Sequence, residues 1–367
     1  MRRFPAPEIA PHVAGLIPYQ PGKPIAELER ELGIRDIIKL ASNENALGPS
    51  PAAVEAIRAH AGDVHLYPEG SCPALRSALA AKLRVDGSCL AFGNGSDEII
   101  HFLGLAFLTP GDQVIQGSPT FSRYEAAARL AQAQCVRIPL RDWRYDLDAV
   151  GDAITAQTRL VFIANPNNPT GTYVTEAELE RLLDRISPRC IVCMDEAYFE
   201  YVDAPDYPDT VALIREQTNI VILRTFSKLY GLAGLRVGYA VARPEIIAAI
   251  EQVREPFNVN HLAQVAALAA LGDADHAQRS RAMVASGRAV LTDGLRALGM
   301  DVVPSQANFV WADTRRDAQA IFQALLRRGV IVRTGGAFGA PTCIRVTVGT
   351  AEQNERLLNT LAEVLAL

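Results

Sequence analysis

Short runs of apolar residues, rich in valine and isoleucine, recur along the chain and alternate with stretches of helical periodicity. The runs that predict strands are 113–116, 135–138, 160–164, 190–194, 220–223 and 237–241. Several are apolar at successive positions, as in strands buried between two layers of helices. A helix is expected over 97–108, and a capping box of Thr175 and Glu178 begins another that runs to about Ile186. The alternation predicts an α/β fold with a mostly parallel sheet.

The pattern changes after about residue 258. The elements expected there are helices over 276–298 and 318–328, strands over 308–312, 330–333 and 343–348, and a last helix capped by Thr350 with Gln353. This mixture predicts a smaller α+β domain. Because 367 residues exceed what one core normally holds, we expect two domains. We assign 1–39 to an N-terminal arm and part of the small domain, 40–258 to the large domain and 259–367 to the small domain.

The first 24 residues contain six prolines, which exclude a long helix or a central strand. Val13, Leu16, Ile17 and Tyr19 add apolar surface that a solvated tail does not need. We therefore expect an extended arm that lies across a partner, with a disordered tail as the alternative.

Composition and charge exclude several classes of protein. With 49% hydrophobic and 21% charged residues, the chain has the composition of a globular protein. The net charge is −5 and no run of lysine or arginine exceeds two residues, so we expect no nucleic-acid partner. There is no run of 18 apolar residues and no apolar segment behind the N-terminal arginines, which predicts a cytoplasmic protein that does not bind membranes.

The cysteines and histidines show no metal-site spacing. Six cysteines are scattered along the chain, which favours free thiols in a reducing compartment. Cys190 and Cys193 form a C-x-x-C inside an apolar run, and we interpret them as part of a buried strand rather than a redox or zinc site. The six histidines form no ligand pattern, so no metal is expected.

Candidate chemistry lies where predicted strands end. Lys228 follows the strand 220–223, and Arg236 comes after a glycine-rich turn. Ligands bind at such edges of α/β sheets, and a desolvated amine beside a cation has a lowered pKa and can attack a carbonyl. Asp195 closes another strand and could be a metal ligand, a general base or the partner of a buried cation. An aspartate facing a pyridine nitrogen would keep that nitrogen protonated.

Two further segments lie where ligands bind in α/β folds, one after a predicted strand and one before a predicted helix. Residues 165–171, Asn-Pro-Asn-Asn-Pro-Thr-Gly, follow an apolar strand and by themselves indicate only a turn. Residues 92–98, Phe-Gly-Asn-Gly-Ser-Asp-Glu, precede a helix, where glycines and free N–H groups favour a phosphate. The G-x-G within this segment is a weak signal by itself.

Together these segments resemble the fold type I aminotransferases, which are aspartate-aminotransferase-like and depend on pyridoxal phosphate. In detail they resemble the histidinol-phosphate aminotransferase family, from about Tyr19 to the last helix. The motifs that carry the resemblance are 40–45, 66–69, 95–98, 168–171, 195–198, 224–228, 233–236 and 344–350. The resemblance implies a large domain that binds pyridoxal 5′-phosphate, and transamination between histidinol phosphate and 2-oxoglutarate in histidine biosynthesis. The products would be imidazole acetol phosphate and glutamate.

The resemblance also implies roles for single residues. Lys228 would bind the cofactor as a Schiff base and later move a proton, and Asp195 would pair with the ring nitrogen. Asn168 and Tyr198 would hydrogen-bond the ring's phenolic oxygen, and Phe121 would stack on the ring. The cofactor phosphate would be held by Ser96, Asp97, Thr225, Ser227, Arg236 and, from the second subunit of a homodimer with shared active sites, Tyr67.

For the substrate, Arg345 matches the arginine that binds the α-carboxylate in amino-acid transaminases. In the histidinol-phosphate family it would bind the substrate phosphate, helped by Arg333 and Tyr19 and with Asn168 nearby. Two guanidinium groups suit a dianion because each can bind it through two parallel hydrogen bonds.

Three alternatives stay open at this point. An aromatic amino-acid aminotransferase or a threonine-phosphate decarboxylase would share most of these motifs. A binding or regulatory module could have kept the fold and lost the chemistry, but no expected catalytic position is replaced and no DNA-binding segment is attached.

Overall fold

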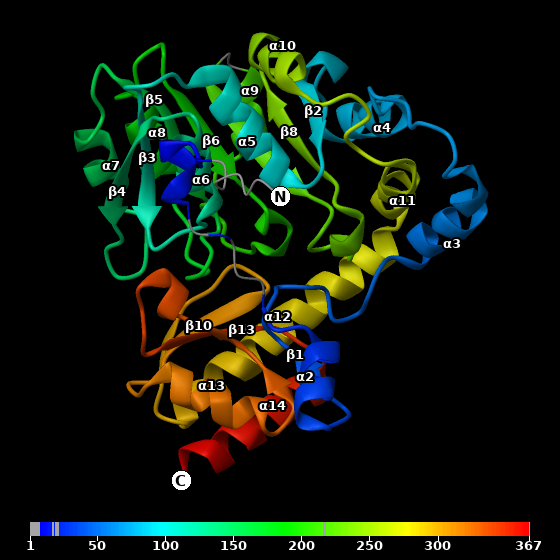
Figure 1. Ribbon diagram of the computed structural model, residues 1–367, viewed down its shortest axis with the longest axis vertical. Coiled ribbons are helices and arrows are strands. Elements are labelled where there is room, and N and C mark those ends of the chain that lie inside the picture. The colour runs from blue at the N-terminus through cyan, green and yellow to red at the C-terminus, as the bar shows by residue number, and fades with distance from the viewer. Residues whose placement is uncertain (1–7, 17, 19–21, 216–217, 367) are drawn as a thin grey trace, which may run out of the picture.

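A seven-stranded sheet forms the centre of the larger part of the molecule (Figure 1). The computed structural model describes residues 8–16, 18, 22–215 and 218–366. The strand order is β2-β8-β7-β6-β5-β3-β4, and β8 alone runs antiparallel to its neighbours. The strands are β2 (Leu90–Gly93), β3 (Gln113–Ser118), β4 (Gln134–Pro139), β5 (Thr158–Ala164), β6 (Ile191–Asp195), β7 (Ile220–Thr225) and β8 (Gly238–Ala242).

The inner strands are buried on both faces because helices cover the sheet. Every residue of β6, β7 and β8 is buried, which explains their largely apolar sequences, whereas β4 lies at the edge of the sheet and has no buried residue. One group of neighbouring helices is α5 (Ser96–Phe107), α6 (Arg123–Leu130) and α10 (Pro244–Val253). The other helices of this part are α7 (Leu147–Asp152), α8 (Glu176–Leu183) and α9 (Thr210–Arg215). The packing of the helices therefore positions the carboxyl ends of β5, β6 and β7.

A second, antiparallel sheet lies below the first in Figure 1. Its order is β12-β13-β10-β9, with β9 (Asp301–Val303), β10 (Phe309–Asp313), β12 (Arg333–Thr334) and β13 (Cys343–Thr347). The helices around it are α12 (Ala274–Ala297), α13 (Ala318–Leu326) and α14 (Ala351–Leu365). The N-terminal α2 (Ile25–Leu32) and β1 (Ile38–Lys39) join this part, since β1 pairs with β11 (Val330–Ile331). Segments from both ends of the chain therefore lie side by side.

Three helices extend from the side of the large sheet: α3 (Pro51–His60), α4 (Pro73–Leu83) and α11 (His261–Gly272). Helix α11 packs against both α3 and α4. No helix in the described ranges is long and apolar enough to cross a membrane.

The expected elements agree with the structure in most positions. All six strands predicted before residue 258 are present, and both capping boxes form at Thr175 and Thr350. The helix expected to reach Ile186 ends at Leu183, ahead of a Ser-Pro pair that disfavours helix. The strand expected over 330–333 is split into β11 and β12, which belong to different sheets.

The N-terminal stretch contains no long helix or central strand in its described residues, where α1 spans only Pro11–Ala14. Ile17 and Tyr19, on which the arm prediction partly depends, lie outside the described residues. Cys190 and Cys193 are buried as expected, and all six cysteines are free. Burial raises the pKa of Cys190 to about 12, so neither a redox nor a metal role is favoured.

Candidate active site

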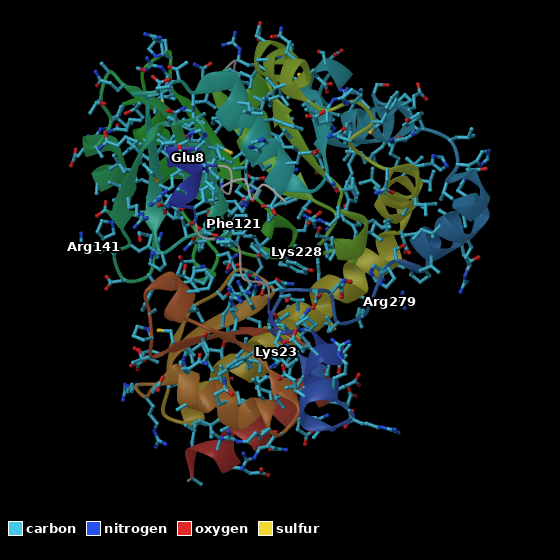
Figure 2. The ribbon with its side chains drawn as sticks, viewed as in Figure 1. Glu8, Lys23, Phe121, Arg141, Lys228 and Arg279 are labelled. Atoms are coloured by element: carbon cyan, nitrogen blue, oxygen red, sulfur yellow. The ribbon has the colours of Figure 1, made fainter. Side chains whose placement is uncertain are left out.

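A cavity of about 330 Å³ opens at the carboxyl ends of β5, β6 and β7. It is also lined from the second sheet by Arg333 and Arg345, so it lies between the two parts of the molecule. Figure 2 shows Phe121 and Lys228 at this boundary. The structure brings together these residues singled out from the sequence: Ser96, Asp97, Phe121, Asn168, Asp195, Tyr198, Thr225, Ser227, Lys228, Arg236, Arg333 and Arg345.

Lys228 follows β7 and presents its amine to the cavity. Burial, together with the positive charges of Arg345 and Arg236 and against the opposite effect of Glu44, lowers its pKa to about 8. The Nζ atom lies 5.6 Å from the centre of the Tyr198 ring. Since a depressed pKa makes the neutral amine accessible near neutral pH, Lys228 is equipped to attack a carbonyl.

Asp195 is the last residue of β6 and is only 6% exposed. Its Oδ2 accepts a 2.7 Å hydrogen bond from the Tyr124 hydroxyl, and its Oδ1 accepts one from the Ala197 backbone N–H at 3.2 Å. Burial raises the pKa of Asp195 to about 6, although both hydrogen bonds act to lower it. A cationic ring nitrogen in the cavity would stabilise the ionised form. Sequence reasoning missed Tyr124, whose only signal was its place three residues after Phe121.

Asn168 and Tyr198 are oriented by neighbours on other elements. Arg345 donates from Nη1 to Asn168 Oδ1, so the amide NH₂ of Asn168 is the group that can donate to a ligand. The second Arg345 nitrogen, Nη2, donates to the Ala41 carbonyl at 2.6 Å. Asn43 donates from Nδ2 to the Tyr198 hydroxyl at 2.9 Å. Asn43 falls inside the 40–45 motif, but no local pattern indicates its contact with Tyr198.

The start of α5 forms a cradle for an anion. The first N–H groups of this 12-residue helix, at Ser96 and Asp97, have no partners within the helix, and its dipole favours negative charge. Gly95 has φ +79°, and a Cβ there would lie 2.5 Å from Arg236 Nη2. Arg236 Nη2 also lies 4.0 Å from the Asp97 carboxylate, whose Oδ1 is buried and makes no hydrogen bond with the described residues. The free N–H groups of α5 and the guanidinium of Arg236 are donors, so the cradle fits a phosphate, whose oxygens accept hydrogen bonds.

Two expected residues are not brought into the cavity. Tyr67 is 84% exposed and stacks on Phe257 with ring centres 4.8 Å apart, but it does not line the cavity of its own chain. Tyr19 lies outside the described residues.

One group of side chains in the described part of the chain could hold a metal ion. His60, Asp63 and His261 have ligand atoms within 4.8 Å of one another, although the sequence spacing gave no sign of it because α11 is far from α3 along the chain. All three are partly exposed and none lines the cavity.

The fold and the cavity define a class of enzyme. A phosphorylated pyridine aldehyde fits the site, which offers Lys228 with its lowered pKa, the buried Asp195 and the anion cradle. The fold, with its mixed sheet, is that of the aspartate-aminotransferase-like fold type I enzymes. The family model for aminotransferase class I and II matches residues 35–361. The protein is thus an aminotransferase that depends on pyridoxal 5′-phosphate.

Similar proteins identify the family within this class of enzymes. Histidinol-phosphate aminotransferase from Moorella thermoacetica is 51% identical over 361 residues, which are 98% of this chain and 94% of the relative. The enzyme of the same name from Bacillus subtilis strain 168 is 48% identical over 358 residues, which are 97% of this chain and 99% of that relative. The crystal structure of histidinol-phosphate aminotransferase from Sinorhizobium meliloti in complex with pyridoxal-5′-phosphate superposes with a TM-score of 0.90 at 28% identity, over 98% of this chain and 97% of that one. The chain belongs to the histidinol-phosphate aminotransferase family.

Proposed function

We propose that this protein transfers an amino group between histidinol phosphate and 2-oxoglutarate, giving imidazole acetol phosphate and glutamate in histidine biosynthesis. The observation that carries the proposal is the pair of arginines in the cavity. Arg333 and Arg345 lie opposite each other on neighbouring strands and both line the cavity, in addition to the separate anion cradle at α5. A substrate that carries its own phosphate matches this second cationic site.

Lys228 acts as the covalent anchor of the cofactor and as the base that moves the proton. Bound pyridoxal phosphate supplies an electron-accepting ring. Once a substrate amine had replaced it on the cofactor, the free Lys228 amine would remain in the cavity, where it could act as the base. Such positioning lowers the activation barrier of an otherwise bimolecular step by on the order of 7 to 11 kcal/mol. Asp195, at the next strand end, keeps the ring nitrogen protonated.

The other cavity residues orient the ring and its phosphate. Asn168 and Tyr198 would donate to the phenolic oxygen of the cofactor, and Phe121 would stack on its ring. The phosphate is held by the N–H groups of Ser96 and Asp97, by Thr225 and Ser227, and by Arg236. These assignments are supported by the position of every one of these side chains on a single cavity.

The substrate phosphate binds Arg345 and Arg333, with Asn168 close to the first arginine. The prediction that Tyr19 helps concerns a residue outside the described ranges and stays a prediction. In Arg345→Gln we expect the KM for histidinol phosphate to rise about tenfold or more, because a charge-assisted hydrogen bond is lost.

We further propose a homodimer in which Tyr67 of one subunit reaches the cofactor phosphate of the other. The proposal is supported by an exposed apolar surface formed by Val64, Leu66, Tyr67 and Phe257. An aromatic pair left in water is costly, and a second copy of the chain that covers it would remove that cost. The six free cysteines favour a reducing compartment, which we take to be the cytoplasm.

A substrate panel tests the reaction. The purified enzyme is supplied with 2-oxoglutarate and either histidinol phosphate or phenylalanine, and glutamate is measured. The proposal expects the higher kcat/KM with histidinol phosphate and a larger loss for that substrate in Arg345→Gln. A preference for phenylalanine would instead identify an aromatic amino-acid aminotransferase, and carbon dioxide release from threonine phosphate would identify a decarboxylase.

A further inference from the structure

The Tyr124 hydroxyl is placed so that its hydrogen bond goes to the carboxylate of Asp195. Tyr124 lies on α6 and is fully buried, and its 2.7 Å bond to Asp195 Oδ2 joins this helix to the end of β6. Because Tyr124 donates to the oxygen that the Ala197 N–H does not use, both carboxylate oxygens are fixed.

Aromatic packing holds the Tyr124 ring in one orientation. The ring stacks parallel to Phe162 of β5, with centres 4.7 Å apart and planes 4° apart. It also meets the edge of Phe121, which lines the cavity, at 5.7 Å and 82°. The three rings form a continuous wall from the cavity to the interior of the sheet, so the hydroxyl has little freedom to turn away from Asp195.

We propose that Tyr124 is a positioning residue that keeps the Asp195 carboxylate ionised and aimed at the ring nitrogen of the cofactor. This inference rests on the proposed role of Asp195 and assigns that role a partner on α6. A hydroxyl that donates to the charged form of a carboxylate stabilises that form, and in a dry site the effect is stronger than in water.

The surroundings of Asp195 favour its neutral form, and a hydrogen-bond donor counteracts them. The titratable groups with electrostatic effects on this carboxylate are Asp97 from α5, Glu196 from the same strand end, Cys193 from β6, Tyr124, Tyr145 and Tyr207. Asp97 and Glu196 are both acidic and favour the neutral form, as does burial. Tyr124 opposes all three, since its hydrogen bond lowers the pKa of Asp195. A neutral Asp195 could not hold a protonated ring nitrogen.

The test compares Tyr124→Phe with wild type by measuring the dissociation constant of pyridoxal phosphate from pH titrations, without any amino-acid substrate. Phenylalanine keeps the ring packing and removes the donor alone. We expect the dissociation constant at neutral pH to rise about tenfold or more, and binding to be lost at a higher pH as the solution is acidified. The matched control is Tyr201→Phe, which removes a buried hydroxyl that has no hydrogen-bond partner in the described structure and does not line the cavity.

A second pair of variants separates positioning from packing. In an Asp195→Asn background the carboxylate is absent, so adding Tyr124→Phe should change the dissociation constant no further. An equal loss in both backgrounds, or a wild-type pH profile in Tyr124→Phe, would overturn the inference. If Asp195→Asn alone leaves cofactor binding unchanged, the proposed role of Asp195 fails, which is a different result from failure of Tyr124 alone.

Discussion

The Lys228 amine lines the cavity with two arginines near it, and this arrangement lowers the pKa of the amine. The pKa of Lys228 is lowered to about 8 first by burial and then by Arg345 and Arg236. Below that pH the amine carries a proton and cannot attack a carbonyl. The cavity therefore favours the reactive form at pH values where an exposed lysine, with an ordinary pKa of 10.5, stays charged.

We expect the rate at which apoprotein captures pyridoxal phosphate covalently to rise with pH, with a midpoint near 8, and to level off above it. Arg345→Gln removes a positive charge that lowers the pKa, so its midpoint should move to higher pH. The exposed Arg315, paired with Asp301 away from the cavity, provides Arg315→Gln as a control with an unchanged midpoint. Stopped-flow absorbance over a pH series measures all three. A wild-type midpoint near 10.5 would contradict the burial of Lys228.

The turn into α5 is the element that we propose to hold the cofactor phosphate. Gly95 and Gly48 both have φ +79°, but a Cβ at Gly95 would meet Arg236 whereas one at Gly48 would meet nothing within 4 Å. Both Gly→Ala variants should lose about 1 kcal/mol of unfolding free energy because alanine is strained at this φ. Gly95→Ala alone should also weaken cofactor binding, by displacing Arg236. Thermal unfolding and cofactor titration of the two variants check this. Equal affinities of Gly95→Ala and Gly48→Ala for pyridoxal phosphate would show that the cradle does not bind the cofactor.

The same elements determine how much could be predicted from sequence. Strands β5, β6 and β7 were predictable because burial on both faces leaves uninterrupted apolar runs at 160–164, 191–194 and 220–223, and the polar group after each run pointed to one sheet edge. The contacts of Tyr124 and Asn43 were not predictable, since each crosses from one element to another through packing that no local pattern encodes. β2 was missed because four residues, Leu90–Gly93, carry too little periodicity.

At the scale of the whole molecule, one chain leaves the proposed site incomplete. Tyr67 points to solvent beside Phe257, and the cavity has no contribution from it. The sequence resemblance implied that Tyr67 is supplied by the second subunit, and its absence from the cavity of its own chain agrees with that prediction.

Subunit mixing tests the shared site. Lys228→Ala and Tyr67→Ala chains, each inactive or weak alone, should regain activity when unfolded together and refolded, because one site of each mixed dimer then has both residues intact. The control mixes Lys228→Ala with Asp195→Asn, whose defects both lie in the cavity of their own chain, and no activity should return. A monomer by light scattering, or equal recovery in both mixtures, would exclude the proposed arrangement.

If the amine of Lys228 binds the cofactor within reach of Asp195, the absorbance spectrum of the protein will report it. Purified protein should show a visible band that borohydride removes while fixing the cofactor to the chain, and a peptide containing Lys228 should carry the label. Lys228→Ala should lose the band, the label and turnover together, whereas Lys23→Ala, a surface lysine paired with Glu31, should keep all three. A Lys228→Ala protein that retained the band and its turnover would show that Lys228 is not the residue that binds the cofactor.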